Sequence, residues 1–361
     1  MVVIDHGMGG GANRYRDIRL DTLRKTGASV VLVTSDLPSL TYRLRLTDAA
    51  SGMQVDCRVE DQVELLRVIE SMSPTAIEIN SLVGYDDVSA MLTAFIRMRR
   101  SHPALRFRFN LHDFHALCPS FTLMDMSGKY CGVPKHEVCR ACLPANARFS
   151  LGMNAGIDIV DWRRAWAEWL ALADERVAFS KSSLDIFSQG IPEVASLAWR
   201  VEPHVLDLTH LRTVEPRLDN PMVVVAVGHL NHAKGAELLG ALARRAEERR
   251  LPLRFAVIGT VEGGAVPASV AVRGAFRRDQ LCELLEAEGA GMAFLPSICP
   301  ETYSYVTDEL MATGLPIAVL DIGAPAERIA SYHSGLLLPR EGLDQQLDAL
   351  VAFARRIGAR F

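Results

Sequence analysis

The chain has 361 residues, of which 49% are hydrophobic and 23% are charged, with a formal net charge of -4. The length suits two domains of roughly 150 to 200 residues each, and the slightly acidic balance argues against a general nucleic-acid binder. No apolar run approaches the roughly 18 residues that cross a bilayer, and the first residues lack a signal peptide's pattern, so we expect a cytoplasmic protein. Seven cysteines, an odd number, do not suggest a disulfide framework.

The first half alternates strand-like and helix-like stretches. A strand over 2–5 leads into GMGGGANRYR, a helical pattern then continues to Lys25, and alternating YRLRLTD with a Ser-Gly turn predicts a hairpin over 41–58. The other expected elements are strands over 29–34, 76–80 and 105–111 and helices over 61–72 and 87–100. Such alternation predicts a parallel sheet with helical crossovers.

Residues 113–156 interrupt this alternation with an irregular loop that is rich in Cys, Pro and Gly. It contains Cys118, Cys131, Cys139 and Cys142, and the last two form the C-x-x-C spacing that is common at zinc. A structural zinc ion could stabilise a loop that has little core of its own, with His115 or His136 replacing one ligand. Reduced thiols and disulfides remain the alternatives.

A helix is expected around 158–173, where Trp162, Trp166 and Trp169 share one face. This stripe favours a core or domain-packing surface over a contact with a membrane or a lipid-linked acceptor. The next distinct stretch, 203–221, has three prolines and little periodicity, as is typical of a linker.

The second half alternates again, with strands expected over 222–228, 254–259, 293–296 and 317–321 and helices over 235–249 and 344–359. We therefore predict an α/β protein with an N-terminal Rossmann-like domain at 1–203, a linker at 204–221 and a C-terminal Rossmann-like domain at 222–361.

The loop GMGGGA, residues 7–12, follows a strand and matches the dinucleotide fingerprint when it is read as G-x-G-x-x-A. Asp36 follows the second strand at about the distance of a ribose-binding acid. A nicotinamide oxidoreductase is therefore one hypothesis. Glycines also let a backbone approach a sugar or a diphosphate closely, and a plain tight turn is the third interpretation.

Two further stretches carry polar groups at expected strand ends. Lys234, in GHLNHAKG at 228–235, follows a strand and opens a helix, and it is the only lysine after residue 200 in a chain that otherwise uses arginine. A lysine there can reach phosphate oxygens as a compact charge. His112 and Asp113 follow the strand over 105–111, where a histidine can donate to a sugar hydroxyl or move a proton.

The stretch PETYSYVTDEL, residues 300–310, places two glutamates eight positions apart between two strand-like runs. Thr302 or Ser304 can cap a helix there, and Gly314 followed by Pro316 can end it. A helix start offers free N–H groups and a positive dipole end to an anion. The pattern predicts a phosphate cradle with a carboxylate on either side. No D-x-D occurs, which disfavours a metal-held diphosphate.

With PETYSYVTDELMATGLPIAVLDIGAPAERI in view, the chain resembles the family-4 glycosyltransferases, which are retaining enzymes of the GT-B fold. The glycine loop, His112-Asp113, Pro203-His204, G-x5-KG at 228–235 and Gly274 follow in the family's order. The cysteine loop after HDFHALCP also resembles a bacterial subgroup that builds surface polysaccharides. The resemblance implies two Rossmann-like domains facing across a cleft and metal-independent transfer of a sugar.

The resemblance also implies roles for single residues. Glu301 would contact donor-sugar hydroxyls, Glu309 would bind the nucleotide ribose, and His112 would touch the sugar or the acceptor. The remaining donor-binding residues would be Gly10, Gly11, Gly228, Lys234, Thr302, Tyr303, Ser304 and Tyr305. One departure stands out, because many relatives carry arginine where this chain has His229. Either Arg273 or another group would compensate, or donor binding would be weak.

We therefore expect a retaining glycosyltransferase that moves a sugar from a nucleotide diphosphate sugar to a glycan or lipid-linked acceptor in polysaccharide biosynthesis. It would need no catalytic cofactor, would bind no nucleic acid and could associate peripherally with the inner face of the membrane or with a polysaccharide assembly. The alternatives are an NAD-dependent oxidoreductase, a GT-B isomerase of nucleotide sugars and a non-catalytic GT-B domain that binds glycans or acts as a scaffold.

Overall fold

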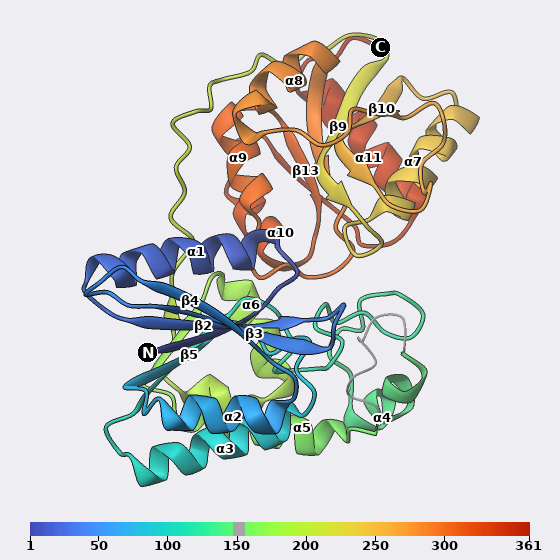
Figure 1. The fold of residues 1–361 in the computed structure, drawn as a ribbon. Helices are drawn as coiled ribbons and strands as arrows, with labels where there is room; N and C mark the ends of the chain where they lie inside the picture. The colour runs from blue at the N-terminus through green and yellow to red at the C-terminus, as the bar shows by residue number, and fades with distance from the viewer. Residues whose placement is uncertain (147–155) are drawn as a thin grey trace. The chain divides into compact units, whose positions relative to one another are not determined.

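The structure, a computed structural model, describes residues 1–146 and 156–361. The chain divides into two compact units, Met1–His204 and Val205–Phe361. Each unit is built on its own mainly parallel sheet with helices on both faces (Figure 1). The end of the predicted cysteine-rich loop, residues 147–155, lies outside the described residues.

The N-terminal unit contains an eight-stranded sheet in the order β4-β3-β2-β1-β5-β6-β7-β8. Its strands are β1 (Val2–His6), β2 (Val30–Asp36), β3 (Thr41–Thr47), β4 (Gln54–Val59), β5 (Ala76–Ile79), β6 (Arg106–Leu111), β7 (Glu175–Ala178) and β8 (Arg200–Val201). β3 runs antiparallel to β2 and β4, which confirms the predicted hairpin, and the other pairs are parallel.

Helices cover both faces of this sheet, with α1 on one face and α2 and α3 on the other (Figure 1). The helices of this unit are α1 (Gly10–Lys25), α2 (Gln62–Ser71), α3 (Val88–Ser101), α4 (His136–Ala145), α5 (Ile159–Leu172) and α6 (Lys181–Gly190). Trp162, Trp166 and Trp169 of α5 are fully buried in the core, as the stripe predicted. The presence of α4 corrects the expectation that the cysteine-rich segment is irregular throughout.

The C-terminal unit contains a parallel six-stranded sheet in the order β11-β10-β9-β12-β13-β14. Its strands are β9 (Met222–Leu230), β10 (Leu253–Val261), β11 (Ala271–Val272), β12 (Ala290–Leu295), β13 (Ile317–Leu320) and β14 (Gly335–Leu338). Its helices are α7 (Ala236–Glu248), α8 (Leu281–Glu288), α9 (Tyr305–Thr313), α10 (Gly323–Ala330) and α11 (Leu343–Arg356). The central strands β9 and β12 are almost continuously buried, as parallel strands covered on both faces require.

The segment that was predicted to be a linker contains no helix or strand, but much of it is fixed to the C-terminal unit. The N–H of Val214 donates to Thr313 O at 2.9 Å, and the N–H of Arg217 donates to Ala290 O at 3.0 Å. Val214 is also 1% exposed in the core of this unit. These contacts make the segment an integral part of the C-terminal unit.

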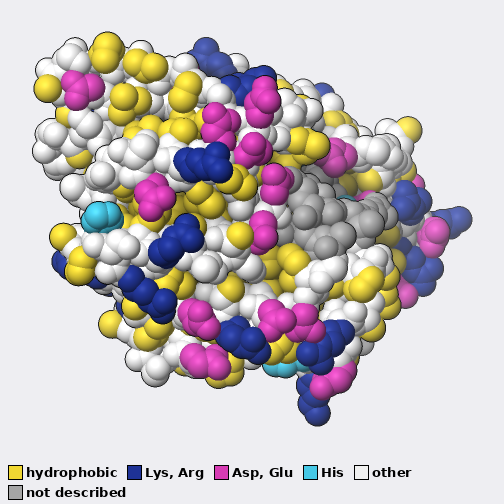
Figure 2. Space-filling model, turned by 60° about the horizontal axis from the view of Figure 1, so that its bottom comes forward, with side chains coloured by type: hydrophobic (Ala, Val, Ile, Leu, Met, Phe, Trp, Pro, Cys, Tyr) yellow, Lys and Arg dark blue, Asp and Glu magenta, His cyan; other side chains and the backbone are white. Residues whose placement is uncertain are grey.

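Acidic and basic side chains are intermixed with apolar atoms on the face that Figure 2 presents. Within the described ranges, none of the helices has both the length and the apolar character that a membrane span requires.

Candidate functional site

The amino end of α9 lies just beyond the carboxyl end of β12, on the edge where parallel α/β sheets bind ligands. Ser304 is the N-cap, and its Oγ accepts a hydrogen bond from Thr307 N at 3.4 Å. The first turn of a helix leaves N–H groups without intrahelical partners and carries the positive end of the helix dipole. This end of α9 is therefore suited to an anion.

Glu301 and Lys234 meet beside this helix end. Lys234 Nζ lies 2.5 Å from Glu301 Oε2, and Ser297 Oγ donates to the other carboxylate oxygen at 2.5 Å. The Glu301 side chain is only 11% exposed, whereas that of Lys234 is 41% exposed. Burial opposes the charge on Lys234, but the Glu301 carboxylate outweighs it and raises the pKa of Lys234. Lys234 is thus held as a cation beside the Glu301 carboxylate.

Two glycines allow the backbone around Lys234 to pack closely. Gly235 has a φ of 77°, and a Cβ there would lie 2.0 Å from Pro296 O, so only glycine lets this turn approach the loop that carries Glu301. Gly228, which lies in β9, has a φ of 114°, and its carbonyl oxygen would lie 1.8 Å from a Cβ on Gly259. The side-chain amide oxygen of Asn231 accepts from Lys234 N at 3.0 Å and fixes the turn.

Glu309 projects from α9 and is almost fully buried. Its carboxylate accepts a hydrogen bond from Arg278 Nη1 at 2.6 Å, and the Arg278 guanidinium also lies 5.5 Å from the ring centre of Tyr305. Arg278 was not predicted from the sequence, because no motif marks it and its carboxylate partner is 31 positions away. Thr302, which lies in the loop between β12 and α9, is also buried.

Tyr303 and Arg328 both contact the carboxylate of Asp308, which is buried. Burial raises the pKa of Asp308. These contacts fix the first turn of α9 against α10, and they hold the tyrosine beside the helix end.

The position that departs from the family pattern is tied to a neighbouring strand. His229 contacts Thr260 Oγ1 at 2.7 Å and Glu262 Oε1 at 2.8 Å. Arg273, the suggested substitute, pairs instead with Glu288 at 2.5 Å. The structure therefore does not bring Arg273 to His229, and it places Arg278 and Arg328 beside α9.

In the N-terminal unit, the glycine loop opens α1 with an unusual backbone. Gly9 and Gly10 have φ values of 82° and 84°, a region that side-chain-bearing residues rarely occupy. Gly11 follows within the first turn of α1. The N–H of Gly9 donates to Asn13 Oδ1 at 2.6 Å, and Asn13 in turn donates to the buried Asp5 carboxylate at 3.1 Å. Burial raises the pKa of Asp5 to about 6.

His112 lies at the end of β6 against aromatic rings. Its ring centre is 4.7 Å from that of Tyr15 and 4.4 Å from that of Phe179. Burial, together with nearby His204 and His6, lowers the pKa of His112 well below its ordinary value, so the imidazole is neutral near pH 7. Asp113 accepts from Ser81 Oγ at 2.6 Å and serves to fix the loop.

Asp36, the acid that the nicotinamide hypothesis assigns to a ribose, is already engaged by protein groups. Its Oδ2 accepts from Arg43 Nη2 at 2.7 Å, from Arg58 Nη2 at 3.2 Å and from Ser39 Oγ at 2.9 Å. The guanidinium and hydroxyl groups would compete with a ribose for this oxygen.

The four cysteines of the predicted zinc site are free thiols, of which Cys139 is buried and Cys118, Cys131 and Cys142 are partly exposed. Burial raises the pKa of Cys118 to about 12 and that of Cys131 to about 11. In the described part of the chain, which includes all four, no three His, Cys, Asp or Glu side chains are placed to share a metal ion. Zinc binding here stays a prediction.

Comparisons with known proteins agree on one class of enzyme. The family model described as glycosyl transferases group 1 matches residues 209–354. A GDP-mannose-dependent alpha-mannosyltransferase of Mycobacterium tuberculosis (strain CDC 1551 / Oshkosh) is 27% identical over 92% of this chain and 81% of its own length.

Solved structures with the same fold include sucrose-phosphate synthase from Thermosynechococcus elongatus, with a TM-score of 0.62 and 14% identity over 99% of this chain and 91% of that one. Anabaena Alr3699/HepE, solved in complex with UDP, has a TM-score of 0.57 and 16% identity over 98% of this chain and 89% of that one. The matched family model and the mycobacterial relative are both described as transferases, which favours the transferase hypothesis over the oxidoreductase.

Proposed function

We propose that this chain transfers a hexose from a nucleoside diphosphate sugar with retention at the anomeric carbon. The family model that matches residues 209–354, the mycobacterial relative and the GT-B fold support this proposal. GDP-mannose is the first donor to test, since the mycobacterial relative is named for it. The acceptor would be a glycan or a lipid-linked glycan, and a lipid-linked acceptor would bring the enzyme to the inner face of the membrane.

The observation that carries this proposal is the contact between Lys234 and Glu301 beside the amino end of α9. A leaving nucleoside diphosphate gains negative charge as the glycosidic bond breaks. Lys234 and the N–H groups of the first turn of α9 would stabilise that charge, as fixed donors do in transition states. Glu309, held by Arg278, would accept hydrogen bonds from the ribose hydroxyls.

Glu301 is better suited to positioning the sugar than to attacking it. Both of its oxygens already contact donors, Ser297 Oγ and Lys234 Nζ, and these contacts lower the nucleophilicity of the carboxylate. We propose that the acceptor oxygen bonds to the anomeric carbon on the face from which the diphosphate departs. The bond between that carbon and the phosphate oxygen breaks, and the acceptor hydroxyl proton moves to an oxygen of the leaving diphosphate.

Substitution of Glu301 tests this proposal. We expect Glu301→Gln to lower transfer from GDP-mannose by about 10²-fold or more, because the neutral amide cannot match a carboxylate in holding a sugar hydroxyl. The exposed Glu283→Gln on α8 is the matched control and should retain full activity. Undiminished turnover by a folded Glu301→Gln protein would remove the role assigned to this carboxylate.

A further inference from the structure

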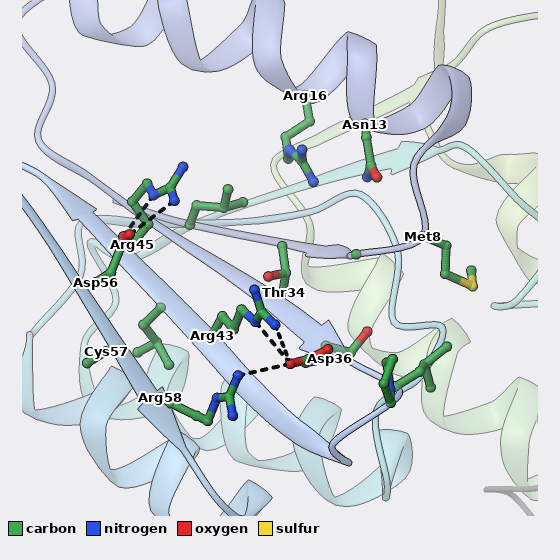
Figure 3. A pocket seen from close by; sticks show the side chains of 16 residues that line it. Met8, Asn13, Arg16, Thr34, Asp36, Arg43, Arg45, Asp56, Cys57 and Arg58 are labelled. Atoms are coloured by element: carbon green, nitrogen blue, oxygen red, sulfur yellow. Dashed lines mark hydrogen bonds and ion pairs between the residues drawn. The ribbon is translucent and has the colours of Figure 1, made fainter. Parts of the chain in front are cut away.

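The N-terminal unit contains an open pocket of about 880 Å³ between α1 and the β2-β3-β4 part of the sheet (Figure 3). Its lining includes Gly7 and Met8 of the glycine loop and four arginines, Arg16, Arg43, Arg45 and Arg58. Two aspartates, Asp36 and Asp56, are the acidic side chains among its lining residues. The lining therefore has two more positive charges than negative charges.

Strand periodicity explains why these charges gather on one face. Alternate residues of a strand point to the same side of a sheet, so Arg43 and Arg45 of β3 share a face. In the register of the sheet Arg43 pairs with Arg58 of β4, and Arg45 pairs with Asp56. Figure 3 shows these side chains on the pocket side of the sheet, with Arg16 of α1 across from them.

The two cross-strand pairs, Arg45–Asp56 and Arg43–Arg58, differ in net charge. Arg45 and Asp56 form a two-bond ion pair at 2.8 and 3.0 Å, so their charges cancel. Arg43 and Arg58 are directly opposed like charges, an arrangement that is unfavourable in a sheet unless an anion lies between them. A single carboxylate oxygen, Asp36 Oδ2, serves both guanidinium groups. Arg43, Arg58 and Asp36 together therefore carry a net charge of +1.

The two guanidinium groups that carry this net positive charge are accessible to solvent. The Arg43 and Arg58 side chains are 61% and 52% exposed, and each guanidinium has five N–H donors. The contacts with Asp36 use two donors of Arg43 and one of Arg58. The remaining donors can hold a phosphate or carboxylate group, for which the planar guanidinium is well shaped.

We propose that this pocket binds an anionic group of the acceptor, a phosphate or a carboxylate, through Arg43 and Arg58. The inference rests on the proposed glycosyltransferase function. It extends that function by naming the acceptor as acidic. Because the pocket reaches Gly7 and Met8, an acceptor anchored by its anionic group would extend toward the glycine loop, where the resemblance places the donor sugar.

Calorimetric titration of the full chain with three matched probes tests the proposal. The probes are α-D-glucose 1-phosphate, D-glucuronate and the neutral methyl α-D-glucopyranoside. We expect at least one anionic probe to bind about tenfold more tightly than the neutral probe, and raising the salt from about 50 to about 500 mM should weaken its binding. The stronger of the two anionic probes identifies phosphate or carboxylate as the group recognised. Equal binding of all three probes would overturn the proposal.

Three variants separate recognition from a structural effect. The double variant Arg43→Gln/Arg58→Gln should weaken the favoured anionic probe about tenfold, whereas Arg140→Gln, which removes an exposed arginine paired with Asp158 outside the pocket, should not. Asp36→Asn removes the competing negative charge and should strengthen binding of that probe. Unchanged binding by the double variant, or weaker binding by Asp36→Asn, would contradict the proposal.

Titration of the same proteins with GDP and GDP-mannose separates this proposal from the one on which it rests. If the chain binds and turns over GDP-mannose but the double variant binds the anionic probes as well as the native protein does, the acceptor proposal fails alone. If no nucleotide sugar binds while the arginine effect persists, the donor assignment fails instead. A urea-unfolding transition of the double variant that matches the native one confirms that the N-terminal unit is folded.

Discussion

At the scale of single residues, the most informative group is Lys234, because the proposed function gives its charge two partners in turn. Without a donor it pairs with Glu301 at 2.5 Å. A bound diphosphate would compete for the same ammonium group, and the sugar hydroxyls would replace it at the carboxylate. In the proposed reaction, the close placement of the two residues would let one exchange of partners engage both ends of the glycosidic bond.

Replacement of Lys234 should therefore affect the chemical step more than the fold. We expect Lys234→Ala to lower kcat by about 10²- to 10³-fold, the range found when a fixed transition-state donor is removed. Lys234→Arg should recover part of the loss, because the charge returns with a different shape. Steady-state kinetics with GDP-mannose measure kcat for both variants. Lys25→Ala, which removes an exposed lysine, is the control and should keep the native kcat. A kcat within about threefold of native for Lys234→Ala would rule out this role.

Buried histidines should make the N-terminal unit sensitive to acid. Burial lowers the pKa of His115 to about 3, so this imidazole stays neutral in the folded protein but takes up a proton in the unfolded chain below about pH 6.5. The unfolded state then binds more protons, and stability falls as the pH falls from about 6.5 toward 3. Protonation of His115 in the unfolded chain should lower the free energy of unfolding by about 1.4 kcal/mol for each pH unit in this range.

Urea unfolding at about pH 7, 6 and 5 measures this slope. His115→Gln should flatten it, because the variant has no imidazole to protonate, whereas substitution of the exposed His136 by Gln should leave it as it was. A His115→Gln protein with the native slope would mean that the acid sensitivity arises elsewhere.

The candidate site could be predicted from sequence only where chain order carries the information. Glu301 and Lys234 each follow a strand of a parallel sheet, and the carboxyl ends of such strands meet at one edge. Their contact in the structure agrees with that reasoning. Arg278 could not be predicted in this way, since it lies in a short 3₁₀ turn before α8 and its relation to Glu309 depends on packing.

At the scale of elements, the strands and helices that were predicted are present, because buried parallel strands are apolar runs that alternate with helical patterns. No element was predicted at β7, α6, α8, α10 or β14, which are four to ten residues long. The short edge strand β8, with two residues, carries no such signal. α4 was also missed, because Cys, Pro and Gly around it suggested a loop, and Pro144 lies inside the helix itself. The antiparallel β3–β4 extension was predicted, but the pocket that it forms with α1 depends on tertiary packing.

The turn between β9 and α7 should tolerate no side chain at Gly235. Gly235→Ala must adopt a φ of 77° and also place a Cβ 2.0 Å from Pro296 O, so the two loops that carry Lys234 and Glu301 would be forced apart. Gly263→Ala is the matched control, because its φ of 66° imposes similar backbone strain of about 1–2 kcal/mol in open space.

Urea unfolding should show a distinctly larger loss of stability for Gly235→Ala than for Gly263→Ala, and only Gly235→Ala should lose transfer activity. Equal losses in stability and activity would mean that backbone strain, rather than the contact with Pro296, explains the need for glycine.

At the scale of the whole molecule, each unit contributes a different kind of group. The C-terminal unit holds Lys234, Glu301 and Glu309, which together suit a nucleotide sugar. The N-terminal unit holds the arginine pocket, which suits an anionic group. Under the two proposals, the C-terminal unit would hold the nucleotide, and the arginine pocket of the N-terminal unit would hold the anionic group of the acceptor.

This division predicts where a nucleotide stabilises the protein. GDP at about 100 times its Kd should raise the free energy of unfolding by about 2.7 kcal/mol, because it binds only the folded protein. Hydrogen exchange of the full chain should show that protection concentrated at residues 228–236 and 297–309. Protection confined to residues 7–13 would indicate that the nucleotide binds the glycine loop.

The most direct test of the account is a crystal structure of the chain with GDP-mannose bound. We predict that the diphosphate lies within hydrogen-bonding distance of Lys234 Nζ and of the N–H groups at the start of α9, with the ribose hydroxyls at Glu309 and the mannose at Glu301. A diphosphate bound instead at the loop around Gly9, with the start of α9 unoccupied, would contradict it.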